Sequence, residues 1–211
     1  MLSGFRAVAA WAEEQLKIPR RPGFAELRQL FEDGVRGNTF NRWLESHGFV
    51  LDDWVSQMVR VYREHQPQIV PHPETVDVLQ RLRSRYRLGL VSDGSLQVQQ
   101  NKLASLGIGF YFDRLVFSDE LGADAWKPSP RPFALVLERL AVAGRKAVYV
   151  ADNPSKDFLG ARRAGMWTVR VRYPDGLYSH LEPPSPEHAP DAEIDTLARL
   201  QEILVSIGEY A

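Results

Sequence analysis

The sequence contains no cysteine among its 211 residues. Disulfide bonds and thiolate metal sites are therefore excluded for it, and a reducing compartment is permitted, so we expect a cytoplasmic protein. Long apolar runs are also lacking, and none approaches the roughly 20 residues that a membrane-spanning helix needs. The stretch from Met1 to Glu14 has one arginine followed by acidic residues, which does not indicate a signal peptide. We expect no membrane partner.

Excess charge is lacking as well, because 26 Lys and Arg face 27 Asp and Glu, for a formal net charge of -1. Such a balance gives nucleic acid no general electrostatic attraction. One basic cluster stands out, in which Arg81, Arg83, Arg85 and Arg87 alternate along the chain. No set of stacking aromatics accompanies it, which favours a solvated helix end over a nucleic-acid patch.

Two regions of the chain differ in their apolar pattern. From Ser3 to about His65 the apolar residues recur at helical spacing and no strand pattern occurs, which predicts a helical bundle. After the break from Pro67 to Pro73, short apolar runs alternate with helical patterns of about ten residues. This alternation is typical of βαβ units and a covered parallel sheet.

The sequence therefore predicts an α/β fold, a Rossmann-like doubly wound parallel sheet, in residues 69–211, with a small α-helical domain in residues 1–68. In the sheet domain we expect strands at 86–91, 115–117, 147–151 and 167–171, and helices at 74–84, 96–106, 130–142, 155–164 and 196–207. The proline-rich stretch 182–190 is expected to form a surface loop.

Polar residues follow the strand expected at 86–91, where ligands bind in open parallel sheets. Ser92, Asp93 and Gly94 open the next helix, and a hydroxyl with backbone N–H groups there suits a phosphate oxygen. A simple helix cap is the alternative. Lys127 lies in a proline-stiffened turn and could neutralise a phosphate or hold a carboxylate, the alternative being a solvated lysine.

Two carboxylates follow the strand expected at 147–151. Asp152 and Asp157 lie five positions apart across a strand–helix turn, so both could face one point. Hard oxygen ligands of this kind favour Mg²⁺. The alternative is an Asp turn followed by an Asp that favours the start of a helix.

Together these segments resemble motifs two, three and four of the haloacid dehalogenase superfamily, in the family's order. They read Leu-Val-Ser92-Asp-Gly-Ser, Trp-Lys127-Pro-Ser-Pro and Val-Ala-Asp152-Asn-Pro-Ser-Lys-Asp157. The helical region resembles the family's C1-type cap. The resemblance implies a hydrolase of the phosphatase branch that acts on a small phosphorylated metabolite, with 2-haloacid dehalogenation as an alternative on the same scaffold.

The resemblance also implies roles for these residues. Ser92 and Lys127 would be catalytic, stabilising charge on the transferring group, and Ser92, Asp93, Gly94 and Lys127 would bind the phosphate. Asp152 would ligate Mg²⁺, and Asp157 would ligate it or hold Lys127.

The family's first motif, an apolar strand ending in Asp-x-Asp, does not occur in the sequence. Its first Asp attacks the phosphorus, so we expect this chain to be inactive alone. The segment from Phe49 to Trp54 lacks the spacing and is expected to be a cap loop, with Asp52 or Asp53 starting a helix. In the family that strand lies between those expected here at 86–91 and 147–151. Without it, either these two pair directly or they lie about 10 Å apart with unpaired edges.

Three hypotheses explain the missing motif. The favoured one is that the start is truncated and the whole protein is an ordinary phosphatase. The second is a non-catalytic relative that binds phosphate or a partner protein. The third is that another chain, a strand donor or a second copy in a homo-oligomer, supplies the strand by β-augmentation.

Overall fold

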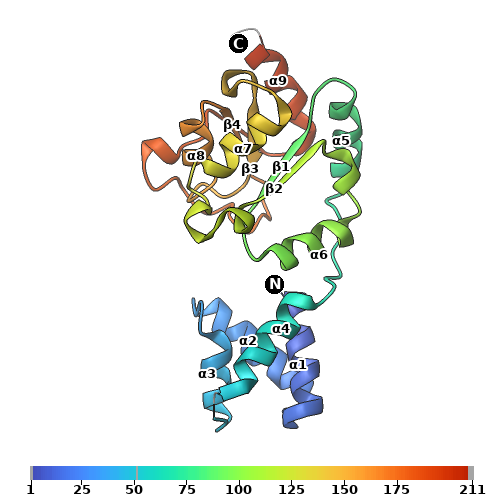
Figure 1. Ribbon diagram of the computed structural model, residues 1–211, viewed down its shortest axis with the longest axis vertical. Helices are drawn as coiled ribbons and strands as arrows, with labels where there is room; N and C mark the ends of the chain where they lie inside the picture. Colours follow the sequence, from blue (N-terminus) through green and yellow to red (C-terminus); the bar gives the residue numbers. More distant parts are fainter. Residues whose placement is uncertain (1, 51, 209–211) are drawn as a thin grey trace. The chain divides into compact units, whose positions relative to one another are not determined.

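The computed structural model describes residues 2–50 and 52–208, which form two compact units (Figure 1). The first unit holds residues 1–69 and 100–105, and the second holds residues 70–99 and 106–211. The first boundary lies one residue after the one expected from the sequence, and the return of 100–105 to the first unit was not predicted. Met1, Leu51 and residues 209–211, which the expected ranges include, lie outside the described residues.

The first unit is a helical bundle, and its described residues contain no strand. Its core is apolar, with Val8, Leu27, Trp43 and Met58 fully buried. Pro22 lies in the first turn of a helix, where its missing N–H costs no hydrogen bond. The helices are α1 (Leu2–Leu16), α2 (Arg20–Glu32), α3 (Thr39–Ser46) and α4 (Asp52–Glu64).

The buried side chain of Asn101 explains why 100–105 joins the first unit. Its amide nitrogen donates to the backbone carbonyls of Arg63, Glu64 and His65 over 3.2, 3.3 and 3.1 Å. These carbonyls at the end of α4 have no partner within the helix, so Asn101 satisfies them from another segment. Asn101 lies in α6 (Leu96–Leu106), whose residues are shared between the two units.

The second unit is the α/β part of the chain, as predicted. Its strands are β1 (Gly89–Ser92), β2 (Arg114–Phe117), β3 (Val148–Ala151), β4 (Trp167–Val171) and β5 (Ala192–Ile194). Besides α6 its helices are α5 (Thr75–Arg83), α7 (Arg131–Leu140), α8 (Phe158–Arg163) and α9 (Leu200–Gly208). Single-turn helices lie at Gly109–Tyr111, Ser118–Leu121, Ala123–Ala125, Gly144–Lys146, Pro186–His188 and Leu197–Arg199.

The strands form two separate parallel sheets. One is β1–β2, with Gly89 opposite Arg114, and the other is β3–β4–β5, with Val148 opposite Trp167. Within the described residues no ladder joins β1 to β3. Of the two outcomes expected from the sequence, direct pairing of these strands is therefore wrong. Neither strand is fully buried, whereas four of the five residues of β4, which is paired on both edges, are buried.

Helices cover both faces of the strands (Figure 1). Tyr149 of β3 packs with Phe133 of α7 and Ala161 of α8. The next residue of the strand, Val150, packs in the cluster of Leu82 of α5 and Leu200 of α9. Successive strand residues thus meet apolar layers on opposite sides, as in a doubly wound fold. No helix among the described residues is long and apolar enough to cross a membrane.

Glu74, just before α5, fastens the start of that helix to the start of the last one. Its carboxylate accepts hydrogen bonds from the Tyr173 hydroxyl, the Thr196 hydroxyl at 2.5 Å and the Leu197 amide at 2.8 Å. Burial opposes the charge, but the hydrogen bonds outweigh it and lower the pKa of Glu74 from 4.5 to about 2. We refer to this cluster as the Glu74 staple.

Candidate active site

The segments that follow β1 and β3 meet at the turn that carries Lys127. The Asp93 carboxylate, just after β1, accepts the backbone N–H of Lys127 over 3.1 Å. The same carboxylate lies 3.5 Å from the ammonium of Lys156, which follows β3. The three sequence segments singled out above therefore lie together at the carboxyl ends of the two inner strands, where open parallel sheets bind ligands.

Lys127 is the buried cation of this cluster. Its ammonium lies 2.6 Å from an oxygen of Asp157 and 3.2 Å from the Tyr149 hydroxyl, and only 8% of its side chain is exposed. Burial opposes its charge, but Tyr149 and the Asp157 carboxylate outweigh that and raise the pKa of Lys127 above 10.5. Lys127 is thus a fixed, permanently charged group, and the alternative of a solvated lysine is wrong.

Asp157 holds this lysine. One of its oxygens accepts from Lys127, and the other accepts the backbone N–H of Asn153 over 3.0 Å. Its side chain is 4% exposed. Of the two roles that the family resemblance left open for Asp157, the contacts match the holding of Lys127, and metal ligation by it stays a prediction.

Asp152 is the exposed carboxylate of the cluster. Partial desolvation of its carboxyl group and then the negative charge of Asp157 raise the pKa of Asp152 above 3.8. Both causes disfavour the charged form of the Asp152 carboxyl, and a bound cation would offset them.

A magnesium ion fits one of the two expected ligands better than the other. Mg²⁺ is commonly held by one or two carboxylates together with substrate phosphates and water, and Asp152 offers such a carboxylate. Both oxygens of Asp157 already accept hydrogen bonds. Within residues 2–50 and 52–208, no group of three or more His, Asp or Glu is arranged to hold a metal ion. The donor set therefore fits a cation shared between Asp152 and a ligand's oxygens.

The segment after β1 agrees only in part with its expected role. The Ser92 hydroxyl donates to the side-chain oxygen of Gln99 over 3.0 Å. Gly94 has φ +112°, and a Cβ there would lie 2.7 Å from Gln99, so this turn requires glycine. The amide of Leu96 at the start of α6 is taken by Asp119. Phosphate oxygens would thus meet fewer free donors here than the sequence suggested.

The Asp93 side chain has a structural role. One of its oxygens accepts from the Ser118 hydroxyl over 2.5 Å and the other from the Lys127 amide. Its side chain is 5% exposed. Only the backbone of Asp93 could therefore serve the phosphate-binding role expected for this residue, because a buried carboxylate repels an anion.

Sequence reasoning missed Tyr149, whose hydroxyl contacts Lys127. It lies inside the apolar run of β3, so the pattern indicated a core residue, and no local signal marks its hydroxyl. Burial raises the pKa of Tyr149 to about 12, with Lys127 opposing this, so Tyr149 is a neutral hydrogen-bonding partner at physiological pH. Sequence reasoning also missed Gln99 and Ser118. Their hydrogen-bond partners, Ser92 and Asp93, lie in other segments of the chain.

Gly160 allows α8 to touch the turn of Lys127. A Cβ at this position would lie 2.6 Å from the backbone oxygen of Pro128 and 2.7 Å from that of Ser129. The small residue at this position therefore permits the close approach of the helix to this turn.

Comparisons with known proteins bear on the family and the fold of the chain. Residues 25–171 match the model of the haloacid dehalogenase-like hydrolase family. A glyceraldehyde 3-phosphate phosphatase from Methanopyrus kandleri is 41% identical over 142 residues, which are 67% of this chain and 58% of that protein. A phosphoserine phosphatase from Thermus thermophilus is 36% identical over 127 residues, 60% of this chain and 48% of that protein. These matches span only about half the length of either relative.

Solved structures give the same fold. A 2-haloacid dehalogenase from Pseudomonas syringae pv. Tomato DC3000 has a TM-score of 0.67 and 26% identity, covering 100% of this chain and 91% of that one. A HAD phosphatase from Thermococcus onnurineus has a TM-score of 0.61 and 29% identity, covering 95% and 87%. The family match, the α/β fold and the relatives lead to one conclusion. This chain belongs to the haloacid dehalogenase-like hydrolase family.

Proposed function

We propose that this chain carries the phosphate-binding part of a magnesium-dependent phosphomonoesterase site for a small phosphorylated metabolite. The observation that carries the proposal is the buried Lys127–Asp157 ion pair at 2.6 Å. It lies at the carboxyl ends of β1 and β3, where both charges act on the carboxyl group of Asp152. The names of the relatives, two phosphatases of small phosphomonoesters, support the same substrate class.

Each residue of the site has a distinct role in this proposal. The Ser92 hydroxyl and the backbone N–H groups of Asp93 and Gly94 bind phosphate oxygens. Lys127 neutralises the negative charge on the transferring phosphoryl group. Asp157 keeps Lys127 charged and in place, and Tyr149 limits its other directions of movement.

The metal would be held by Asp152, with Asp157 as an indirect support through Lys127. When bound, Mg²⁺ supplies further charge neutralisation at the phosphate. Asp152 is exposed as a residue, and its carboxyl group is partly desolvated.

The proposal includes that this chain alone does not turn over substrate. No Asp-x-Asp pattern occurs in its 211 residues. Asp93 and Asp157 are buried and held by hydrogen bonds, so neither is free to attack a phosphorus atom. Covalent catalysis requires an activated nucleophile that can reach the substrate.

Calorimetric titration of the full chain with inorganic phosphate, with and without Mg²⁺, tests the proposal. We expect phosphate binding that Mg²⁺ strengthens, and no hydrolysis of p-nitrophenyl phosphate. The Asp152→Asn variant should lose the Mg²⁺ effect. Asp175→Asn, the same change at an exposed loop residue of the same unit, should keep it.

Each result bears on one part of the proposal. Absence of phosphate binding would contradict the site as a whole, and an unchanged Mg²⁺ effect in Asp152→Asn would contradict the metal assignment. Mg²⁺-dependent turnover by the chain alone would contradict the proposed inactivity.

Hydrolysis of a 2-haloacid is a second candidate, which the structural similarity to a 2-haloacid dehalogenase favours. In that reaction Lys127 would bind the acid's carboxylate. Halide release from 2-chloropropionate would reveal it, and phosphate binding that Mg²⁺ strengthens would favour the phosphatase instead.

A further inference from the structure

The loop that follows β4 is held by a buried arginine of that strand. We call this loop, residues 173–182, the β4 loop. The Arg170 side chain is 1% exposed, and its guanidinium donates to the backbone carbonyls of Tyr178 and Leu181 over 2.8 and 2.9 Å. Hydrogen bonds from charged donors are among the stronger ones in proteins. The β4 loop therefore has a fixed place relative to its strand.

A second arginine, Arg172, holds the same loop. It donates to the Ser179 carbonyl over 2.6 Å and to the Glu182 carboxylate over 2.6 Å. The carboxylate of Glu193 in β5 accepts from both Arg170 and Arg172 over 3.3 Å. The two arginines thus face two glutamates, so their charges are compensated and the anchor offers no net positive charge to a ligand.

The β4 loop is anchored on the face of the sheet that carries the candidate site. In the ladder of β3 with β4, Arg170 lies opposite Ala151, the residue before Asp152. Side chains alternate between the two faces along a strand, so those of Arg170 and Tyr149 lie on the same face. The Tyr149 hydroxyl contacts Lys127, and the charge of Arg170 acts on the carboxyl group of Asp152. The anchor of the loop is therefore level with the site.

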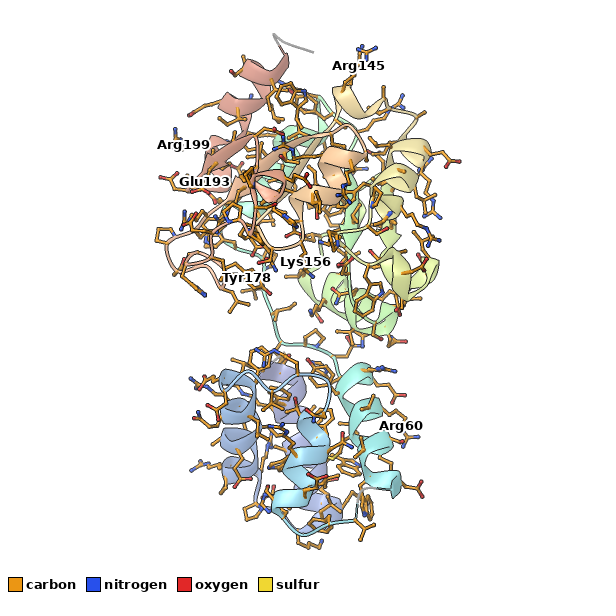
Figure 2. All side chains as sticks on the ribbon, turned by 90° about the vertical axis from the view of Figure 1, so that its left-hand side faces the viewer. Arg60, Arg145, Lys156, Tyr178, Glu193 and Arg199 are labelled. Atoms are coloured by element: carbon orange, nitrogen blue, oxygen red, sulfur yellow. The ribbon has the colours of Figure 1, made fainter. Side chains whose placement is uncertain are left out.

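The loop and the site also lie at the same end of the second unit. Figure 2 shows Tyr178 of the β4 loop and Lys156 at one end of this unit, and Arg145 at the other. Lys156 contacts Asp93 at the carboxyl ends of the strands. The β4 loop thus borders the candidate site on the side of β4.

The side chains of the β4 loop are uncharged or acidic. No Lys or Arg occurs in it, and Tyr178, Ser179 and His180 follow one another with hydrogen-bonding groups. Asp175 is exposed and forms no ion pair in the part of the chain that the structure describes. A second anionic group of a ligand would meet this negative charge without a lysine or arginine of the loop to balance it, whereas hydroxyl groups would find donors and acceptors.

We infer that the β4 loop receives the organic part of the substrate and selects phosphomonoesters whose organic part is small, hydroxylated and uncharged. Esters that carry a second anionic group are disfavoured. Arg170 is the positioning residue of this selection, because it holds the loop and is itself buried away from the ligand. The inference rests on the proposed phosphate-binding role of Lys127 and Asp152, and it adds the class of substrate.

Calorimetric titration of the full chain with two matched esters tests the selection. Glycerol 3-phosphate and 3-phosphoglycerate share a three-carbon skeleton and a phosphate, but the second has a carboxylate in place of a hydroxymethyl group. The titrations contain excess Mg²⁺ and little salt, at pH 8, where an ordinary histidine carries little charge. We expect glycerol 3-phosphate to bind at least about fivefold more tightly, and added salt to reduce the difference by screening the repulsion.

A charge variant of the loop separates local repulsion from net charge. Asp175→Lys places a cation in the β4 loop and should raise the affinity for 3-phosphoglycerate at least about fivefold, which removes the preference. Glu138→Lys is the matched control, because it changes the net charge equally at an exposed position of α7 and should leave the preference as it is.

Variants of the anchor test the role of Arg170. Arg170→Met combined with Glu193→Gln removes the main anchor without changing the net charge. It should speed hydrogen exchange in fragments that contain residues 176–182 and bring the ratio of the two affinities close to one. Because this pair is partly buried, Arg172→Met combined with Glu182→Gln serves as the milder variant and should shift the ratio in the same direction. A purely structural role would lower stability and leave the ratio unchanged.

Hydrogen exchange with bound ligands locates the contact. Glycerol 3-phosphate should slow exchange in the fragments of residues 173–182, and inorganic phosphate should not. Absence of phosphate binding would contradict the proposed function. Phosphate binding with equal affinity for the two esters, with no protection of the β4 loop, or with the same ratio in the anchor variants would overturn this inference alone.

Discussion

Replacing Lys127 by methionine tests whether the site depends on its buried ion pair. The change keeps the length of the side chain but removes the ammonium, which leaves the Asp157 carboxylate buried with only the Asn153 N–H at 3.0 Å. Breaking one partner of a buried pair costs about 3–5 kcal/mol, because the remaining charge is uncompensated. That is a large share of the roughly 5–15 kcal/mol that stabilise a typical domain.

A double-mutant cycle gives the decisive result. Asp157→Asn alone should cost about as much as Lys127→Met, since it leaves the buried ammonium without its anion. The double variant removes both charges and should recover much of the loss, so that the coupling free energy is about 2 kcal/mol or more. Lys156→Met is the matched control, because that lysine is 41% exposed and its contact with Asp93 is longer, and it should cost less than about 1 kcal/mol.

Native-state hydrogen exchange of the segment from β3 to α8 is the assay, because it reports the second unit separately from the helical one. The free energy of opening is obtained from it for the wild type, both single variants and the double variant at pH 7. If the double variant lost the sum of the two single losses, the pair would be uncoupled and the description of the site would be wrong.

Three further predictions concern contacts described above. Glu74 has a pKa lowered to about 2 in the folded state, so its stabilisation is complete above pH 4.5 and is lost as pH falls toward 2. The two pKa values correspond to at most about 3 kcal/mol of unfolding free energy, and we expect about 2 kcal/mol because the side chain is 20% exposed. In urea titrations, the free energy of unfolding should differ less between pH 6 and pH 3 in Glu74→Gln than in wild type. Gly160→Ala should destabilise the second unit by about 1–3 kcal/mol, since its Cβ would press on the oxygen of Pro128 at 2.6 Å, and a melting temperature equal to wild type would refute this. Asn101→Ala should cost about 1–3 kcal/mol, and faster exchange at the end of α4 should reveal it.

The strands with strong local patterns were predictable from the sequence. β4 has the predicted bounds, Trp167–Val171, because its Trp, Thr and Val residues favour strands and it follows the turn at Gly165. β1 begins three residues later than expected, since pairing with β2 begins only at Gly89. β5, Ala192–Ile194, was not predicted, because three residues carry no pattern and only pairing with β4 makes them a strand.

Two helix boundaries differ from the predicted ones because tertiary hydrogen bonds set them. α8 begins at Phe158 and not near Ser155, because the residues before it form the turn in which Asp157 accepts the Asn153 amide. The last helical segment splits into a single turn at 197–199 and α9, since the Glu74 staple holds the amides at its start. Such tertiary hydrogen bonds leave no trace in apolar spacing.

The site residues were predictable as a set but not in their contacts. Ser92, Lys127, Asp152 and Asp157 each follow a strand or occupy a stiff turn, and that order identified them. Their partners come from other segments. Which carboxylate would bind Lys127 and which would remain exposed depends on backbone geometry around Asn153 that no local sequence rule encodes.

The Glu74 staple also constrains the order of events during synthesis. Glu74 and the hydroxyl of Thr196 are 122 positions apart, so the ribosome makes one partner long before the other. The contact closes a loop that spans most of the second unit, and contacts of such long range form late in folding. The helices of the first unit can pack much earlier, because the buried residues of their core all lie between Phe5 and Met58. A nascent chain that has not yet exposed residue 196 would therefore hold a helical bundle followed by an α/β unit whose first helix still lacks the contacts of Glu74 with the C-terminal segment.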